Sequence, residues 1–394
     1  MKKQLLRRVL TVVFLQLGGL GVLSGPAQET PVAEALEDKT EFLQSLLDRG
    51  EGIVRFPDGR FAISRALEIT DGTRLICSPK THLRLADGAN CPIIKNRHKG
   101  RQITRGVTIE GGVWDGNNLA QQRDEPKDKT FAGAGPGGEL VCFNFMEDFT
   151  LRDLTIKDPE SYAVMLTGVD RFTVENITFD FNMKRPNMDG IHVNGYARNG
   201  LIRNLKGSTN DDMVALNSDE GFWLCENADI ENITIDGLYN GAYGFTGVRL
   251  LSRKAKVRNI AIRNVYGAFR LNAVNFTHWG DDPAGEYGHF DGILIDGVFA
   301  SSLLKTGKGQ NGLIWFQEGL RHIGRVTIQN VVRTDEPDAR NDVYTIEIHK
   351  NVNIESLVIR DVIQRVPGKD KPPVVIHPDA KIRNLSIEGV LTLD

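Results

Sequence analysis

The chain has few aromatic residues, few cysteines, almost no net charge and only one long hydrophobic run. Aromatic residues make up 7% of its 394 residues, whereas glycine is abundant at 41 residues. This balance suits a turn-rich β protein better than a helical one. The formal net charge of −3 provides no general positive field for nucleic acid or anionic lipid, so we expect neither partner.

The long hydrophobic run lies at the N-terminus. A basic head over residues 1–8 precedes an apolar stretch over residues 9–23, and small residues follow at 25–27. This pattern is typical of a secretory signal peptide, whereas an uncleaved anchor is less favoured because the run is short for a bilayer span. We therefore expect a signal peptide over residues 1–27, a single domain over residues 28–394, and a secreted or periplasmic protein that does not contact membrane after cleavage.

The four cysteines leave two alternatives open. Export permits disulfides, and Cys77, Cys91, Cys142 and Cys225 allow three sets of pairings, of which Cys77 with Cys91 is the most local. The alternative, which we favour, is four buried thiols packed inside the fold. No Cys–His spacing predicts a zinc site, and we expect no metal and no other cofactor.

From residue 52 onward, short segments of alternating apolar residues recur. After the first two segments, most neighbouring segments are 23 to 33 residues apart, which is typical of a solenoid. Their β-branched residues at period two predict a β-solenoid, and a leucine-rich repeat fits worse because its leucine spacing is absent. The segments are residues 107–110, 154–157, 177–180, 233–236, 260–263, 293–296, 326–329, 357–360 and 385–388.

Other local patterns complete the predicted architecture. Apolar residues over 32–48, among them Leu36 and Phe42, fall near one face of a helix that we expect to cap the open end of the core. Asparagines that recur just before the segments are expected to stack at a corner and satisfy backbone groups there. The polar insert over residues 117–138 is expected to be a loop.

Three aspartates form two clusters. Asp189 precedes the Asp211–Asp212 pair by 22 residues, about one coil of the solenoid. Because neighbouring strands lie about 4.8 Å apart, carboxyl groups on adjacent coils can be roughly 5–9 Å apart, which covers both modes of glycoside hydrolysis. Successive strand residues alternate faces, so at least one of Asp211 and Asp212 should lie at a bend that enters the strand. Aspartates are also common in turns, but two clusters without a lysine beside the pair favour a catalytic site.

The same segments resemble the family 28 glycoside hydrolases, the polygalacturonases and their relatives. Residues 186–190 (Pro-Asn-Met-Asp-Gly) are similar to the family's Asn-Thr-Asp-Gly motif, and residues 211–217 to the Asp-Asp motif about one coil later. Residues 111–116 and 157–162 match the upstream context. The resemblance implies an all-β fold, a right-handed parallel β-helix, and inverting hydrolysis of glycosidic bonds, commonly in pectin-type polymers.

The resemblance also implies roles for the matched residues. Asp211 corresponds to the general acid, Asp189 and Asp212 to the residues that activate water, and Asn187 to a residue that orients substrate or a carboxylate. Three carboxyl groups close together are expected to raise the pKa of the acid, since they cannot all ionise cheaply.

Two residues of the family pattern are missing. Residues 243–251 contain no histidine where the family has Gly-His-Gly, and Arg270 is kept from its Arg-Ile-Lys motif while Asn272 replaces the lysine. In the family, that arginine and lysine hold a uronic acid carboxylate. Arg249 is therefore a candidate for the missing charge, and a neutral or differently charged sugar is equally open.

A histidine and a tryptophan complete the predicted substrate-binding residues. His192 lies between two apolar residues that should point inward, so its ring should point outward, where it either orients Asp189 or is an ordinary solvated histidine. One of Trp279 and Trp315 is expected to wall the site, although tryptophan packs in cores equally often.

Three functions remain open from the sequence. The favoured one is hydrolysis of a polysaccharide or oligosaccharide, either pectin-like or another glycan that contains uronic acid. The second is a polysaccharide lyase or epimerase, in which the aspartates bind Ca²⁺ and a basic residue abstracts a proton. The third is a non-catalytic carbohydrate-binding or adhesin β-helix.

Overall fold

The computed structural model describes residues 36–50, 52–122, 138–220, 227–241, 243–280, 285–303, 311–336, 343–367 and 371–393. The expected signal peptide, Cys225 and most of the insert over residues 117–138 lie outside the described residues. No helix within them is long and apolar enough to cross a membrane.

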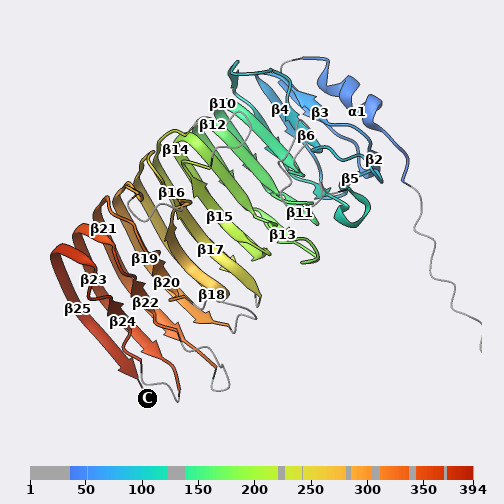
Figure 1. Cartoon of the computed structure of the whole chain (residues 1–394). Helices are drawn as coiled ribbons and strands as arrows, with labels where there is room; N and C mark the ends of the chain where they lie inside the picture. The colour runs from blue at the N-terminus through green and yellow to red at the C-terminus, as the bar shows by residue number, and fades with distance from the viewer. Residues whose placement is uncertain are drawn as a thin grey trace, which may run out of the picture. The chain divides into compact units, whose positions relative to one another are not determined.

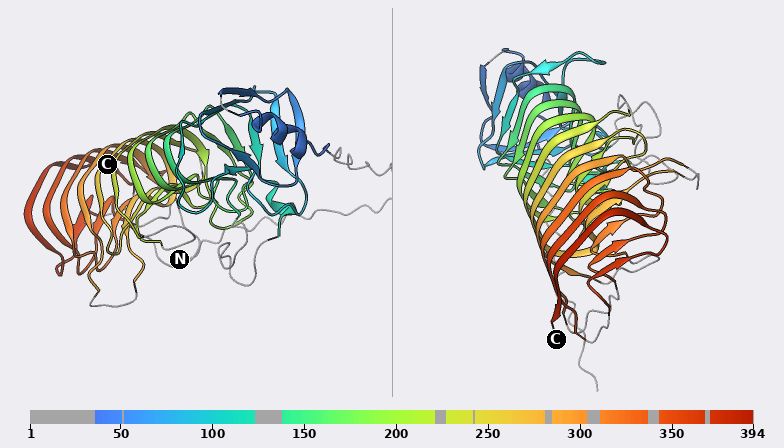
Figure 2. Two further views of the ribbon diagram at one scale, coloured as in Figure 1. Left: turned by 90° about the horizontal axis from the view of Figure 1, so that it is seen from above. Right: turned by 90° about the vertical axis from the view of Figure 1, so that its left-hand side faces the viewer.

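The described residues form a parallel β-helix (Figure 1). Their 25 strands belong to one sheet, and each strand pair in it is parallel. Successive coils stack on one another along the β-helix (Figure 2). The predicted all-β solenoid is therefore confirmed.

The elements follow one another in chain order. They are α1 (Thr40–Leu47), β1 (Gly52–Arg55), β2 (Gly59–Ile63), β3 (Leu67–Ile69), β4 (Thr73–Ile76), β5 (Thr81–Leu85), β6 (Ile94–Asn96), β7 (Thr104–Arg105), β8 (Thr108–Glu110), β9 (Val113–Asp115), the 3-10 helix η1 (Asn118–Ala120), β10 (Val141–Arg152), β11 (Thr155–Lys157), β12 (Val164–Glu175), β13 (Thr178–Asp180), β14 (Ile191–Ser208), β15 (Asp212–Asn217), β16 (Ile230–Asn240), β17 (Gly244–Leu251), β18 (Val257–Thr277), β19 (Phe290–Ser302), β20 (Ile314–Phe316), β21 (Ile323–Thr334), β22 (Ile346–Ile348), β23 (Asn353–Arg365), β24 (Val374–Ile376) and β25 (Lys381–Leu393).

Long strands bend and contribute to more than one face of the β-helix. The first residues of β14 pair with β15, whereas residues from 197 onward pair with β16. We call the face that contains the start of β12, the start of β14, β15, β17, the end of β18, β20 and β22 the site face. Its inward residues, such as Ile191, Val214 and Val248, are fully buried and join one continuous core.

The recurrent segments do not all lie on one face. The six segments from residue 233 onward are stacked in register, and residues 108–110 join the same column through β10. Residues 155–157 and 178–180 pair with each other on the next face. The same alternation of apolar residues serves both faces, because inward side chains of each face enter the shared core.

Asparagines stack at the corners, as predicted. Asn232 donates to Asn199 at 3.3 Å, and Asn259 donates to Asn232 at 3.0 Å. A second ladder includes Asn204, which donates to Asn176 at 3.1 Å. All five have positive φ, which asparagine tolerates better than most residues. The bonds that join these ladders connect side chains to one another, whereas Asn384 donates to the Glu355 carbonyl at 3.0 Å and so satisfies a backbone group, as expected.

The N-terminal helix is present but shorter than predicted. It begins at Thr40 because Asp38 accepts hydrogen bonds from the Thr40 backbone N–H at 2.9 Å and hydroxyl at 2.6 Å, which holds the preceding chain outside the helix. Leu36 therefore lies before the helix, and Phe42 is 47% exposed, so their predicted place on its apolar face was wrong. Leu43 and Leu47 enter the core, consistent with a cap.

Within the described residues, Cys77 and Cys91 are free thiols. Cys77 is buried, and Cys91 and Cys142 are half-buried. The local Cys77–Cys91 disulfide is therefore not formed. Burial raises the pKa of the Cys77 thiol to about 12 and that of Cys91 to about 11, so neither is a reactive thiolate.

Candidate active site

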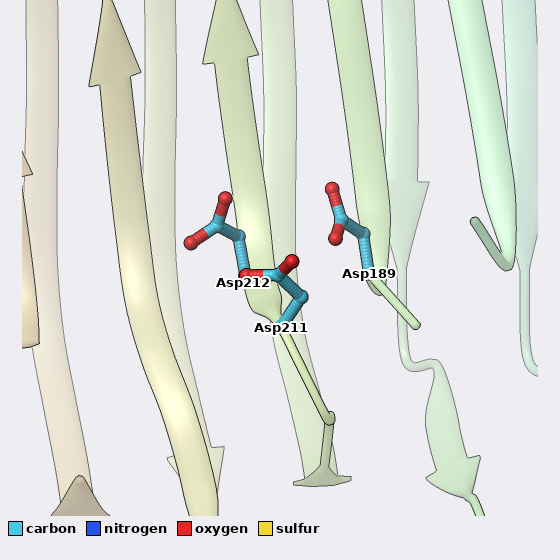
Figure 3. Close-up of side chains that lie close together, drawn as sticks. All are labelled: Asp189, Asp211 and Asp212. Atoms are coloured by element: carbon cyan, nitrogen blue, oxygen red, sulfur yellow. The ribbon is translucent and has the colours of Figure 1, made fainter. Parts of the chain in front are cut away.

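The three predicted aspartates meet on the site face (Figure 3). Asp189 lies two residues before β14, Asp212 begins β15, and Asp211 lies at the bend before that strand. Since Ile191 pairs with Val214, the register places Asp189 beside Asp212 in neighbouring coils. One carboxylate oxygen from each aspartate lies within 4.8 Å of the others. The bend that the sequence required therefore falls at Asp211.

Gly190 allows the two coils to approach closely at this point. Its backbone N–H donates to the Asp212 carbonyl at 2.9 Å. A β-carbon at position 190 would lie 2.5 Å from the Met213 carbonyl oxygen and 2.7 Å from the Phe179 ring. A side chain here would push β14 and β15 apart.

We expect Gly190→Ala to destabilise the protein by about 1–3 kcal/mol, as overpacking does elsewhere, and to lower kcat at least about tenfold because the carboxylates separate. Thermal unfolding and steady-state kinetics would measure both effects. Gly88→Ala is the control, because a β-carbon there meets nothing within 4 Å and only its φ of +70° is strained. Unchanged stability and kcat in Gly190→Ala would contradict the close approach.

The three carboxyl groups titrate above their ordinary range. Burial raises the pKa of Asp189 to about 7, although His192 opposes that rise. Burial, followed by the neighbouring Asp212 and Asp189 carboxylates, raises the pKa of Asp211 well above its usual value. Burial also raises the pKa of Asp212, against the attraction of Arg249. The expected rise in the acid's pKa therefore has desolvation as its main cause.

His192 points away from the core, as predicted, but is not solvated. Its ring is buried, with Nδ1 2.6 Å from an Asp189 oxygen and Nε2 2.5 Å from a Glu220 oxygen. It stacks on Tyr162 with ring centroids 3.8 Å apart and planes 7° apart. Burial alone lowers the pKa of His192, but Glu220 and Asp189 together raise it to about 10. The solvated-surface alternative was wrong, and the contact with Asp189 is present.

Arg249 and Trp279 lie beside the aspartates. Arg249 Nη1 is 3.6 Å from an Asp212 oxygen, and its Nε donates to the Thr277 hydroxyl at 3.2 Å. The guanidinium carbon is 5.3 Å from the centroid of the Trp279 ring, which is 43% exposed. Trp315 lies on the same face, two coils from Arg249. Of the two candidate tryptophans, Trp279 is therefore the one that contacts Arg249.

Arg270 contacts the residue before Asp211. Its Nη2 donates to the Asn210 side chain at 2.8 Å, and its guanidinium lies 5.1 Å and 5.2 Å from the rings of Tyr243 and Phe245. Asn272 is fully buried and donates to the Gly312 carbonyl at 2.6 Å. Asn272, which replaces the family lysine, is thus hydrogen-bonded to the backbone of the next coil.

Asn187 is half-buried and has a φ of +55°, two residues before Asp189. It lies in the chain just outside β14.

Sequence reasoning missed two residues of this site, Tyr162 and Glu220. Glu220 is buried in the turn after β15, where Asn217 donates to its oxygen at 2.9 Å. The residue before it, Asp219, accepts three backbone N–H bonds from residues 253–255 at 2.6–2.7 Å. An Asp-Glu pair after a strand looks like an ordinary turn, and only the contact with His192 distinguishes it.

The charges of the cluster are largely balanced within the protein. Four carboxyl groups are present: those of the three aspartates and Glu220. His192 contacts Asp189 and Glu220, whereas Arg249 contacts Asp212. The three aspartates are close enough to share a cation in principle. With two side-chain cations already in contact, the arrangement suits proton transfer between carboxyl groups, a sugar oxygen and water.

Comparison with known proteins agrees with this geometry. Residues 77–271 match the model of glycosyl hydrolases family 28. Over these residues the chain therefore belongs to the family 28 glycoside hydrolases, as its motifs indicated.

Individual relatives are distant. A polygalacturonase of Medicago sativa is 25% identical over 184 residues, which cover 45% of this chain and 41% of the relative. The chain thus spans less than half the length of that relative. An exopolygalacturonase of Oenothera organensis is 24% identical over 68% of this chain and 73% of its own. The structure of an exopolygalacturonase from Thermotoga maritima superposes with a TM-score of 0.61 at 14% identity, covering 88% of this chain and 86% of that one, which supports the fold.

Proposed function

We propose that this protein hydrolyses glycosidic bonds in a pectin-like or other uronic-acid-containing polysaccharide or oligosaccharide. The observation that carries the proposal is the meeting of Asp189, Asp211 and Asp212 from adjacent coils, with oxygens within 4.8 Å. Membership of the family and the polygalacturonase names of two relatives support the substrate class.

In the proposed reaction, Asp211 is the general acid. Its raised pKa keeps it protonated to higher pH than an ordinary aspartate, so that it can donate a proton to the glycosidic oxygen as that bond breaks. A water molecule attacks the anomeric carbon from the opposite side and gives its proton to Asp189 or Asp212, which inverts the configuration. Two hydrogen bonds of about 2.7 Å allow one water to bridge oxygens that lie up to 4.8 Å apart.

Arg270 is the proposed contact for a uronic acid carboxylate. Its Nε is buried and has no hydrogen-bond partner among the described residues, and its Nη2 bonds only to a neutral amide. Arg249 is already paired with Asp212, so its proposed part is to hold that carboxylate and to border the sugar beside Trp279. Asn187 and His192 would contact the sugar or orient Asp189.

We also propose that the protein is secreted or periplasmic after removal of residues 1–27, and that residues 28–394 are one domain. The support is the basic head and apolar run of the N-terminal sequence.

The test is turnover on a panel of plant and microbial polysaccharides. New reducing ends and the absorbance of unsaturated products are followed in parallel, with and without chelator. We expect reducing ends without absorbance, unaffected by chelator. Absorbance that requires Ca²⁺ would instead identify a lyase, and no release from any uronic acid glycan would contradict the substrate class.

A further inference from the structure

The proposed hydrolysis needs one carboxyl group to hold a proton while two neighbours remain ionised. Three aspartates with oxygens within 4.8 Å do not by themselves specify which one is protonated. The neighbouring side chains differ from one aspartate to the next, and this difference decides which one is protonated.

We propose that Glu220 and His192, covered by Tyr162, act as a positioning unit that keeps Asp189 ionised and oriented as a base and leaves the shared proton on Asp211. This inference rests on the proposed function and assigns a role to Glu220, which lies outside the family motifs quoted above, and to Tyr162, the last residue of the matched segment 157–162.

Both ring nitrogens of His192 face carboxylate oxygens at hydrogen-bond distance, 2.6 Å for Asp189 and 2.5 Å for Glu220. A neutral imidazole donates from one nitrogen only, whereas an ionised carboxylate only accepts. The pair of contacts is therefore satisfied by an imidazolium between two carboxylates. Charge-assisted bonds of this kind are short and strong, so they also fix the direction of the Asp189 carboxylate.

Glu220 is itself held in place. Asn217 donates to the same Glu220 oxygen that contacts His192. Asp219 binds three consecutive backbone N–H groups after β17, which ties the turn after β15 to the next coil. Glu220 thus enters from the coil of Asp212 and reaches back to a histidine on the coil of Asp189. The unit therefore connects the two coils beside Asp189.

Tyr162 closes the remaining side of the ring. It lies in the coil before Asp189, is 5% exposed, and stacks face to face on His192. An aromatic face attracts a cation and keeps water from it. The imidazolium is consequently enclosed, and its charge acts on the carboxylates rather than being screened by solvent.

The three aspartates differ in whether they contact a cationic side chain. Asp189 contacts His192, and Asp212 contacts Arg249 at 3.6 Å. Within the described residues, Asp211 has no ion pair. Two aspartates are thus paired with cations as bases, and the third is left as the acid. The ionisable groups that surround His192 are Tyr162, Asp189, Asp211, Asp212, Glu220 and Arg249.

Glu220→Gln removes one charge while preserving the shape of the side chain. Without that charge, His192 loses its proton more easily and Asp189 loses its cation. We expect kcat to fall about 10- to 100-fold with KM changed less than about threefold. The ascending limb of the pH profile of kcat/KM, which reports ionisation of the base, should move to lower pH, because the Glu220 charge raises the pKa of Asp189 in the wild type. The descending limb, which reports Asp211, should move much less.

The matched control is Glu175→Gln. Glu175 is a buried glutamate paired with Arg203, in the column that contains residues 108–110 and outside the site face. We expect it to leave the pH profile in place. A fall in kcat for Glu220→Gln with an unmoved ascending limb would reduce Glu220 to a structural role and overturn the proposal.

A second readout does not depend on turnover. In protein labelled with ¹⁵N-histidine, the His192 signal, assigned with His192→Gln, should show both nitrogens protonated up to pH 8. In Glu220→Gln it should titrate at lower pH. A neutral His192 ring at pH 7 in the wild type would overturn the proposal even if the protein is an active hydrolase. If His192 is an imidazolium but the protein shows no turnover, the proposed function is contradicted and the proposed charge of His192 is not.

Discussion

Asp212→Asn is expected to lower kcat by about 10³-fold, the middle of the range for the loss of a general acid or base. Asparagine keeps the shape of the side chain but cannot accept a proton from water. It also leaves Arg249 without its carboxylate partner, which lies at 3.6 Å in the wild type. Steady-state kinetics would measure the loss, which corresponds to about 4 kcal/mol of transition-state stabilisation.

The control for this substitution is Asp180→Asn, at the end of β13. Asp180 is an exposed carboxylate that pairs with Lys157 on another face of the β-helix. It should retain wild-type kcat. If Asp212→Asn retains more than about a tenth of the wild-type kcat, Asp212 is not a base, since such groups are worth at least about 10²-fold.

Asp211→Asn is expected to separate substrates by their leaving groups. On a natural polysaccharide, kcat should fall about 10³-fold because the departing sugar oxygen is no longer protonated. On an aryl glycoside with an acidic phenol, which departs without a proton, the loss should be less than about tenfold. The descending limb of the pH profile should also disappear, because it reports the ionisation of Asp211.

Asp189→Asn is the variant with which Asp211→Asn should be compared on both substrates. Asp189 lies within 4.8 Å of the same cluster but is assigned to activate water. Its loss should slow both substrates equally, because water attacks the anomeric carbon in each case. Equal losses on both substrates for Asp211→Asn would contradict its role as the acid.

The sequence was sufficient to predict the meeting of the aspartates because the information is local. Asp189 and the Asp211–Asp212 pair are one coil apart, and alternation of strand residues requires the bend that is found at Asp211. The core was predictable for the same reason, since period-two alternation marks the inward residues on every face.

The neighbours of the aspartates were harder to predict because the coils differ in length. From Val214 to its partner Val248 the chain takes 34 residues, and from Val248 to Val274 it takes 26. A fixed period cannot place Arg249 next to Asp212, or Trp279 over Arg249. Glu220 was missed because its partner lies on the previous coil, 28 residues away.

Proton NMR of the products during the first turnovers tests the central claim most directly. Hydrolysis with inversion predicts a new hemiacetal anomeric signal whose configuration is opposite to that of the bond cleaved, followed by slow mutarotation. Retention of configuration would indicate a covalent intermediate on one of the aspartates. Vinylic signals in place of the hemiacetal would show elimination, and the account of Asp211 as an acid and Asp189 and Asp212 as bases would be wrong.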